Sequence, residues 1–372
     1  MSVDWNWGKY YLKDNPFVTS PIINVLSKDK RINGRLFCKE IVSNEYEKLT
    51  TLIAEKHNMI FVYSPSSVLG TGKSALMAAA YWDLRDREEN PIWAEATGGV
   101  ATSPTLGRVI DSMLAEGILD RMTSKIGEVS YHRIFSLLSN QFRPIPGLVG
   151  ALTKILQTTP EETAKKFTNI RRSLLTFSAT DVFGYLTALM IEVGLRRPVI
   201  FIDQFEEFVR THHGYAMLDR LGNEINDLLR ATQNRTTLVV SLHPEAETIL
   251  SSAAGKYIEE LAPINDQTMV KLRSFDPSAL VTLTEYYLNE YRIEKSKCPP
   301  TYPFTEDVLK YTSLQVRKRP RAFIIALHYA LLQGGKLGYP EIDESFISNE
   351  QNHVKIFGQP SEWKRYKEGQ LK

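Results

Sequence analysis

Apolar and polar residues follow two patterns along this chain, and the patterns predict strands and helices in turn. Short unbroken apolar runs predict buried strands at residues 59–63, 92–96, 199–203, 236–241 and 269–272. Longer stretches with an apolar residue every three or four positions predict helices at residues 39–55, about 104–121, 130–141, 179–193 and about 215–232. Because strands and helices alternate, we expect a five-stranded parallel α/β sheet flanked by helices.

The strand pattern stops before residue 276. Helical patterns then follow at residues 278–292, 305–312 and 320–333. The pair Gly334-Gly335 predicts the end of the last of these helices. Residues 336–372 are polar and show no clear periodicity before a short helix predicted at residues 361–368. A small helical part is therefore expected after the α/β part.

Composition sets the broad class of protein. The chain has 372 residues, 43% of them apolar, which is enough for two domains or for one large core with appendages. A formal net charge of +2 gives no support for binding nucleic acid through overall charge, although a local basic face stays open. Cys38 and Cys298 lie far apart without a CxxC motif, so we expect reduced thiols.

Targeting segments are not expected either. Residues 1–11 lack the basic and apolar regions of a signal peptide, and no apolar run is long enough to span a membrane. We therefore expect a cytoplasmic or nucleoid-associated protein. Residues 1–35 are irregular and aromatic, with Trp5, Trp7 and Tyr10 among them. We expect this arm to pack on the protein surface, and binding to a partner is the alternative.

A phosphate-binding loop is predicted at residues 67–74, SVLGTGKS, between an apolar strand and a run of small residues typical of a helix. Gly70 and Gly72 would let backbone N–H groups converge on phosphate oxygens, with Thr71 and Ala75 in the same cradle. Lys73 would reach the β- and γ-phosphates, and Ser74 would bind Mg²⁺. The usual pattern opens with glycine, where this chain has Ser67.

A second group of polar residues follows the buried run at residues 199–203. Asp203 ends that run and could hold Mg²⁺ directly or through water. Glu206 or Glu207 could polarise the water that attacks the γ-phosphate. Ser241 ends the next predicted strand and could sense the γ-phosphate or orient water; a serine with no such role is the alternative.

Two basic segments admit more than one interpretation. Residues 317–321, RKRPR, could fold back onto a γ-phosphate, contact a DNA backbone or be solvated. Residues 165–172 include four cations on a predicted helix, which could face an acidic partner or only solvent. His212-His213 has no ligand partner at suitable spacing, so we expect a loop rather than a metal site.

With these motifs in place, residues 30–335 resemble the AAA+/STAND class of P-loop ATPases, and most closely its initiator (origin-recognition-like) and transposition-regulator group. Gly34-Arg35 resembles the pair that helps to close the adenine pocket in that class. The run Asp203-Gln204-Phe205-Glu206-Glu207 resembles the STAND Walker B pattern, although AAA+ proteins usually have Glu where this chain has Gln204. The segment 319–322, RPRA, resembles the initiator lid motif, which makes Arg321 the candidate sensor of the γ-phosphate.

The same resemblance implies a domain organisation. It predicts an aromatic arm at residues 1–35, an ATPase core at 36–274 with a helical insertion at about 125–178, a helical lid at 275–335 and a tail at 336–372. An arginine finger acting on a neighbouring subunit cannot be assigned among Arg230, Arg235 and Lys256. The tail is too short for the winged-helix domain of origin-recognition relatives, which weakens a prediction of sequence-specific DNA binding.

Three functions are open from the sequence. The first is a Mg²⁺-dependent ATPase that binds ATP and ADP, forms homo-oligomers on ATP and acts on DNA or a protein–DNA complex. DNA would bind at residues 165–172 and 317–321, and a protein partner at the insertion or the arm. The second is a STAND-type nucleotide switch. The third is an adaptor that binds nucleotide and hydrolyses it weakly, which Ser67 and Gln204 would allow.

Overall fold

A computed structural model describes residues 7–64, 70–95, 110, 112–113, 117–141, 143–158, 174, 176–203, 235–242, 267–294 and 297–371. The chain forms two compact units. The first comprises Met1–Tyr46, Val68–Ala78 and Leu272–Lys372. The second comprises Glu47–Ser67 and Ala79–Lys271.

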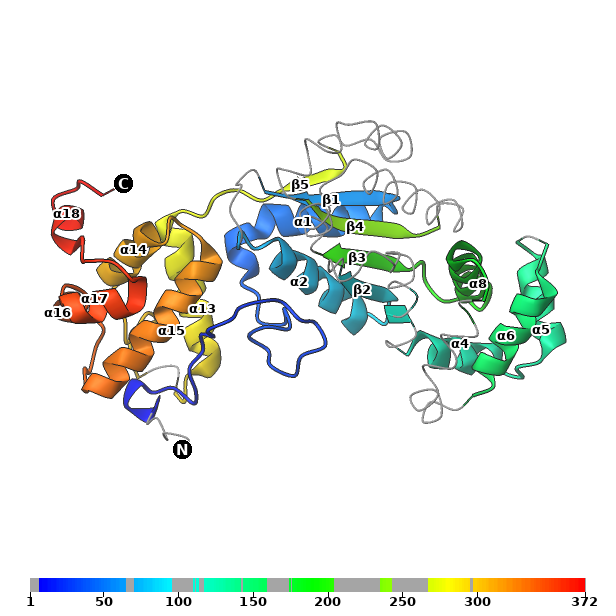
Figure 1. Cartoon of the computed structure of the whole chain (residues 1–372), viewed down its shortest axis with the longest axis horizontal. Helices are drawn as coiled ribbons and strands as arrows, with labels where there is room; N and C mark the ends of the chain where they lie inside the picture. Colours follow the sequence, from blue (N-terminus) through cyan, green and yellow to red (C-terminus); the bar gives the residue numbers. More distant parts are fainter. Residues whose placement is uncertain are drawn as a thin grey trace. The chain divides into compact units, whose positions relative to one another are not determined.

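The second unit is built on a parallel sheet of five strands (Figure 1). The strands are β1 (Met59–Tyr63), β2 (Pro91–Glu95), β3 (Val199–Asp203), β4 (Thr237–Leu242) and β5 (Met269–Lys271). Their order across the sheet is β2-β3-β4-β1-β5, and every pairing is parallel. All residues of β1, β3 and β4 are buried, as expected for continuous apolar runs inside a parallel sheet. The predicted α/β fold is confirmed.

One face of this sheet belongs to an apolar core that includes helices following β2 in sequence. These helices are α4 (Ile118–Ile126), α5 (Tyr131–Ser139), α6 (Pro146–Leu156) and α8 (Ala179–Glu192). Leu238, Val240 and Leu242 of β4 share one apolar core with their buried side chains. Helices α5 and α6 lie side by side (Figure 1). The described part of residues 125–178 is mainly helical.

The helix expected at about 104–121 is interrupted in the structure: the described residues 110, 112, 113 and 118–121 are helical, whereas residue 117 is not. Gly117 adopts a left-handed backbone, with φ of 71°, directly before α4 begins at Ile118. A left-handed residue cannot continue a right-handed helix, so one helix through Gly117 is excluded. Residues 104–109, 111 and 114–116 of this prediction lie outside the described residues.

The other face of the sheet carries an aromatic group. Tyr81 of α2 (Lys73–Asp86) meets Trp93 of β2 and Phe201 of β3 with ring centroids 6.0 and 6.1 Å apart. Trp93 and Phe201 are stacked at 6.0 Å. Alternate residues of a strand point to opposite faces. Thr237, Val239 and Ser241 therefore face this second side, because Leu238, Val240 and Leu242 belong to the core on the first side.

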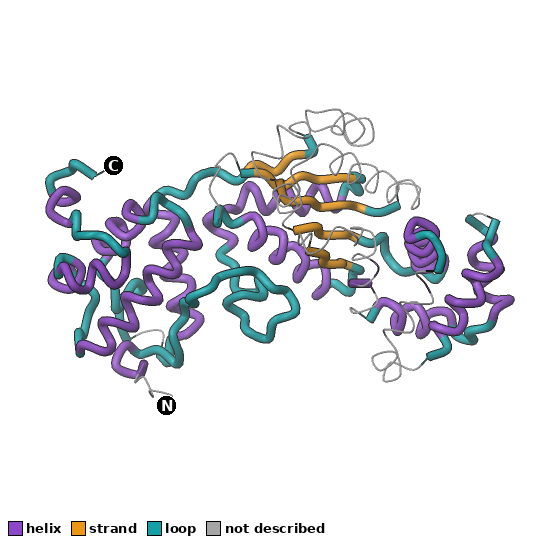
Figure 2. The backbone as a smooth tube through the Cα atoms, in the orientation of Figure 1, coloured by secondary structure: helices purple, strands orange, loops and turns teal. Residues whose placement is uncertain are grey.

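The first unit contains the helices of the C-terminal part (Figure 2). They are α13 (Pro277–Tyr291), α14 (Glu306–Gln315), α15 (Pro320–Leu337), α16 (Glu344–Ile347), α17 (Glu350–Phe357) and α18 (Trp363–Lys367). Two 3₁₀ turns, η1 (Trp7–Tyr10) and η2 (Lys39–Val42), come earlier in the chain, and η2 leads into α1 (Ser43–Ala54). Helix α13 begins as its sequence predicts: the Asp276 side chain accepts a hydrogen bond from Ala279 N–H at 2.7 Å, and Pro277 follows at the first helical position.

Helix α15 does not end where its sequence suggests. The predicted stop at Gly334-Gly335 is wrong, because the helix continues to Leu337 and is capped by Gly338 with φ of 82°. Gly334 is inside the helix for a packing reason. A Cβ atom there would overlap Cδ1 of Ile342 and would lie 3.1 Å from the Tyr10 hydroxyl. Glycine thus lets two other segments approach the helix backbone.

Gly334→Ala is expected to destabilise the chain, although alanine is the better helix former. The added methyl group must displace Ile342, and overpacking of this kind costs about 1–3 kcal/mol. Chemical denaturation of the wild type and the variant measures the difference in free energy of unfolding. Gly150→Ala in α6 is the matched control, because nothing lies within 4 Å of its Cβ position, and it should stabilise by up to about 1 kcal/mol. Stabilisation by both variants would contradict this packing.

The tail holds more structure than its sequence predicts. Helices α16 and α17 were missed, whereas the short helix predicted at residues 361–368 is confirmed as α18. His353 of α17 is fully buried. Its Nε2 accepts a hydrogen bond from the Tyr311 hydroxyl at 2.8 Å, and its Nδ1 donates to the Gln359 carbonyl at 2.7 Å. The imidazole therefore fixes the tail onto α14 in its neutral form.

The stability of this packing is expected to depend on pH. Burial lowers the pKa of His353 from its ordinary value of 6.5. Below pH of about 6.5 the unfolded chain takes up a proton that the folded chain resists, so this contribution is complete above that pH and is lost as the pH falls. Urea unfolding at pH 7.5 and 5.5 should show a larger loss of stability for the wild type than for His353→Gln. Equal losses of stability in the wild type and in His353→Gln would contradict a buried, neutral His353.

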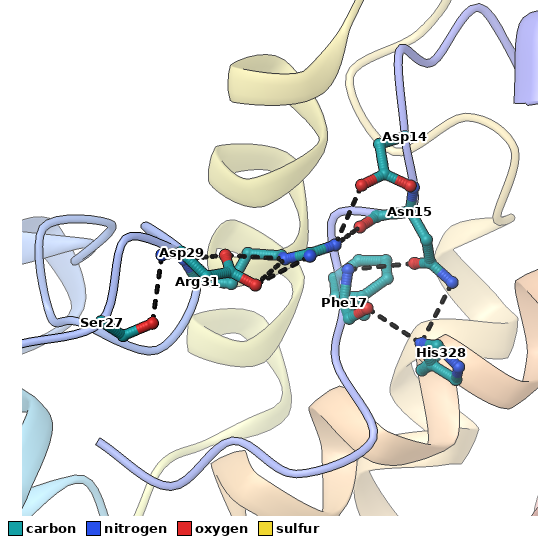
Figure 3. Close-up of polar contacts among 7 residues, drawn as sticks. All are labelled: Asp14, Asn15, Phe17, Ser27, Asp29, Arg31 and His328. Carbon is teal, nitrogen blue, oxygen red and sulfur yellow. Dashed lines mark hydrogen bonds and ion pairs between the residues drawn. The ribbon is translucent and has the colours of Figure 1, made fainter. Parts of the chain in front are cut away.

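The N-terminal arm packs within the first unit through buried aromatic side chains. Phe17 is 1% exposed and stacks on Tyr287 with centroids 6.0 Å apart. The Asn15 side-chain carbonyl accepts from Phe17 N–H at 3.0 Å, and its amide meets His328 Nδ1 at 3.1 Å (Figure 3). Arg31 pairs with Asp29, and its hydrogen bonds lower the pKa of that carboxyl. These contacts agree with the expectation that the arm packs on the protein.

Candidate functional site

The predicted phosphate-binding loop is described from Gly70 onward, and residues 65–69, which include Ser67, lie outside the described residues. Gly70 and Gly72 have φ of 87° and 93°, a backbone region that favours glycine. Helix α2 begins directly after them, at Lys73. The order of strand, glycine turn and helix is the one the motif predicts. The first N–H groups of a helix have no partner inside it, so they and the helix dipole favour an anion here.

Two buried polar groups at this turn are unpartnered. Lys73 is 6% exposed and makes no hydrogen bond or ion pair within the described part of the chain. The Thr71 hydroxyl is also buried, with no hydrogen-bond partner among those residues. An ammonium removed from water is costly unless an opposite charge compensates it. The turn therefore has the donors and the positive charge of a site for an anion such as phosphate, which fits the predicted roles of Lys73, Ser74 and Ala75.

Arg321 lies over this turn from the second position of α15. Its backbone N–H meets the Gly70 carbonyl at 3.5 Å, and a Cβ on Gly70 would lie only 2.7 Å from the Arg321 Cβ. The guanidinium group makes no hydrogen bond or ion pair with any described residue. Its cationic end is thus available beside the glycine turn. The structure brings Gly70 and Arg321 together, as expected if the arginine folds back towards a bound phosphate.

Phe275 is a neighbour of the turn that sequence analysis missed. Its ring lies 3.8 Å from the Cβ position of Gly72, and the side chain is 8% exposed. Phe275 lies in the short segment between β5 and α13, where the sequence shows no periodicity that would predict such a position. Phe275 covers Gly72 and limits the space for a side chain there.

The Gly34-Arg35 turn packs on helix α2. Gly34 is buried with φ of 85°, and a Cβ there would overlap the Cβ of Ala78, one turn after Ser74. The Asn33 side chain accepts a hydrogen bond from Arg35 N–H at 2.9 Å and so fixes the turn. The Arg35 residue itself is exposed. Gly34 therefore belongs beside the helix that carries the candidate phosphate site, and the adenine-pocket role stays a prediction.

The basic cluster at residues 317–321 lies at the turn between α14 and α15. Arg317 and Lys318 are exposed, with φ of 53° and 57°. No carboxylate among the described residues forms a salt bridge with Arg317, Lys318 or Arg319. Exposed cations without ion-pair partners are suited to anions in solution. The other basic segment, residues 165–172, lies outside the described residues.

Asp203 and Ser241 belong to the second unit, at the carboxyl ends of two neighbouring strands. Ile202 of β3 pairs with Val240 of β4, so Asp203 and Ser241 come next at the same level of the sheet. Side chains at one level of a parallel pair point to the same face. Asp203 is 3% exposed and Ser241 is fully buried. The structure thus places these two candidates next to each other on neighbouring strands, and their roles stay predictions.

Several candidates cannot be compared with the structure. Gln204, Glu206 and Glu207 lie outside the described residues, as do His212-His213, Arg230 and Lys256. Arg235 is described, and its guanidinium donates a hydrogen bond to the Gln141 side chain. The guanidinium group of Arg235, a candidate arginine finger, therefore binds a residue of its own chain in this structure.

Possible metal ligands and both cysteines lie in the described part of the chain. That part of the chain holds no group of three or more His, Cys, Asp or Glu that could bind a metal ion. Mg²⁺ needs fewer protein ligands, since one or two carboxylates and substrate phosphates suffice, and the oxygens of Asp203 and Ser74 fit it chemically. Cys38 and Cys298 are free thiols, and burial raises the pKa of Cys38. No helix in the described ranges has the length and apolar character to cross a membrane.

Sequence comparison with known proteins gives one short match. No family model matches the sequence. One curated protein, RNA-directed RNA polymerase L of Murine pneumonia virus (strain 15), is 33% identical over 85 residues. That match covers 23% of this chain and 4% of the polymerase, so it carries no statement about the whole protein.

Solved structures match most of the chain. The ORC2 protein of Aeropyrum pernix, in its ADPNP–ADP complexes, gives a TM-score of 0.52 at 12% identity, over 95% of this chain and 74% of that one. Cdc6p of Pyrobaculum aerophilum gives 0.50 at 11% identity, over 88% of this chain and 70% of that one. At such low identity the likeness concerns the fold. The chain shares the fold of these two proteins, which agrees with the fold that its motifs predict.

Proposed function

We propose that this chain is a Mg²⁺-dependent ATPase of the initiator type, which assembles on ATP and acts on DNA or a protein–DNA complex. The observation that carries the proposal is the Lys73 ammonium at the glycine turn before α2, which is buried and has no partner among the described residues. Such a charge favours binding of a phosphate anion. The ADPNP–ADP complexes of the ORC2 protein, which shares the fold, support an adenine nucleotide as the ligand.

Each candidate residue then has a defined task. The N–H groups at the start of α2 and the Lys73 ammonium bind the phosphates, and Arg321 approaches the γ-phosphate from α15. Ser74 and Asp203 would hold Mg²⁺, which supplies charge neutralisation at the phosphate oxygens. Glu206 or Glu207 takes the proton of the attacking water, and Ser241 orients that water. Phosphoryl transfer of this kind depends on positioning and on stabilising charge.

Mg²⁺ removal is expected to stop hydrolysis. EDTA, or the substitution Asp203→Asn, should lower the rate of phosphate release by about 100-fold or more, because several kcal/mol of charge stabilisation are lost. A phosphate-release assay in excess Mg²⁺ and in EDTA measures this. Asp120→Asn, at an exposed position of α4, is the matched control and should leave the rate unchanged. A rate that is independent of Mg²⁺ would contradict the proposed role of Asp203.

Assembly and DNA action have their own test. We expect light scattering of the full chain to show larger particles with ATP than with ADP or without nucleotide, and further growth with duplex DNA. Binding of DNA should weaken steeply with salt. Arg317→Glu with Lys318→Glu should weaken it, whereas Lys355→Glu with Lys364→Glu, also at exposed positions, should not. An unchanging monomer that binds nucleotide without turnover would instead indicate the switch or the adaptor.

A further inference from the structure

The second unit contains a cavity of about 530 Å³ at the amino ends of its strands. Helices α1 and α2 contribute Thr50, Ile53, Ala54 and Leu84 to its wall, and Val199 and Thr237 are the first residues of β3 and β4. Asp203 and Ser241 lie near the opposite ends of the same two strands. The cavity is therefore distinct from those two candidate residues, and its volume is in the range of small-molecule sites.

Cations dominate the charge of this cavity. Lys56, Arg87, Arg196 and Arg197 line it, against a single carboxylate, Glu89. Glu89 is already engaged, because its Oε1 lies 2.9 Å from Arg196 and 3.7 Å from Arg87. Lys56 and Arg197 have no carboxylate partner within the described part of the chain. A surplus of positive charge in a concave site favours a polyanion.

Hydrogen bonds hold the Arg197 guanidinium group in place, but they do not use all of its donors among the described residues. Its NH2 group donates to the Asn58 side-chain oxygen at 3.1 Å and to the Thr236 carbonyl, while its Nε is buried without a hydrogen-bond partner among the described residues. Burial lowers the pKa of this guanidinium group. A preorganised guanidinium with an unused donor is suited to an oxyanion.

Thr237 lines the cavity and carries a second donor without a partner among the described residues. It is 1% exposed, and its hydroxyl has no hydrogen-bond partner among the described residues. The alternation along β4 directs its side chain to the face of the sheet that carries Tyr81 of α2. A buried hydroxyl is costly to leave unpaired, so this position favours a polar ligand atom.

The remaining wall is apolar. Ile53, Ala54, Leu84 and Val199 line the cavity beside the cations. An inorganic ion would leave this wall uncovered, whereas an organic molecule with an anionic end would use both parts. From these features we infer that the cavity binds a small organic phosphate, with its phosphate group at Arg197, Lys56 and Thr237 and its carbon skeleton against the apolar wall.

The test uses phenyl phosphate and inorganic phosphate as probes, titrated by calorimetry into the full-length Lys73→Ala chain so that the proposed nucleotide site does not contribute. Phenyl phosphate should bind, and more tightly than inorganic phosphate. Lys56→Glu should weaken the binding about tenfold or more, and Thr237→Val about three- to tenfold. Because the Thr237 hydroxyl has no hydrogen-bond partner among the described residues, Thr237→Val should fold with no loss of ligand-free stability.

Two matched controls make the result specific. Thr187→Val removes another buried hydroxyl, in α8, that has no partner within the described ranges, and Lys154→Glu changes an exposed lysine of α6. Both residues lie outside the cavity lining. Neither should alter the affinity for phenyl phosphate. The inference is overturned if phenyl phosphate does not bind, or if the controls weaken it equally. It is also overturned if Lys56→Glu weakens the binding of duplex DNA but does not change the binding of phenyl phosphate. Failure here leaves the ATPase proposal untouched, because that site is disabled throughout.

Discussion

Lys73→Ala is expected to abolish ATP binding by this chain. The wild-type ammonium is 6% exposed and has no partner among the described residues, so we expect a bound phosphate to compensate its charge. The variant loses both the charged hydrogen bond and the electrostatic attraction between the ammonium and the phosphates. The affinity for ATP should therefore fall by at least about 100-fold. Equilibrium titration with a fluorescent ATP analogue measures the change.

The nucleotide-free stability of this variant provides a check on folding. Removing an uncompensated buried charge should leave the free energy of unfolding unchanged or raise it. Lys355→Ala, at an exposed position of α17, is the control and should bind ATP as the wild type does. A well-folded Lys73→Ala chain with full affinity for ATP would contradict the phosphate-site assignment.

Arg321→Ala is expected to impair turnover far more than binding. The Arg321 side chain lies over Gly70, with its guanidinium free of partners among the described residues, so it can meet charge that develops on the γ-phosphate. Loss of one such donor should lower kcat by about 100- to 1,000-fold. The affinity for ATP should change only a few-fold, because Lys73 and the helix N-terminus remain.

Single-turnover and steady-state phosphate release separate these two effects. Arg321→Lys should restore part of kcat, since it keeps the charge and loses the planar geometry of the guanidinium group. Arg317→Ala, in the same basic cluster but exposed, should have little effect on kcat. Equal losses for Arg317→Ala and Arg321→Ala would show that the cluster acts through its overall charge, against the role proposed for Arg321.

The strands were predictable because their chemistry is local. Residues 59–63 and 199–203 are continuous apolar runs, and both occur as buried strands with those limits. A parallel strand covered on both faces needs no alternation, so the run alone defines it. The start of α13 could also be predicted from local sequence, because Asp276 caps the helix and Pro277 is its first residue.

The features that sequence analysis missed depend on distant contacts. Gly334 suggested a helix end, but its small size is needed where Ile342 and Tyr10 approach α15. Helix α16 spans four residues and α17 eight, too few for a helical period to stand out, and both are held by tertiary packing. In the candidate site, the motif predicted that Gly70, Gly72 and Lys73 form the phosphate-binding turn. The position of Phe275 beside Gly72 depends on the tertiary structure and could not be predicted from the sequence.

The central claim is that the glycine turn before α2 binds ATP, and calorimetric titration of MgATP into the wild-type chain tests it most directly. The account predicts one site per chain, competition by ADP, and loss of the signal in Lys73→Ala. A folded wild-type chain that binds neither ATP nor ADP would contradict it.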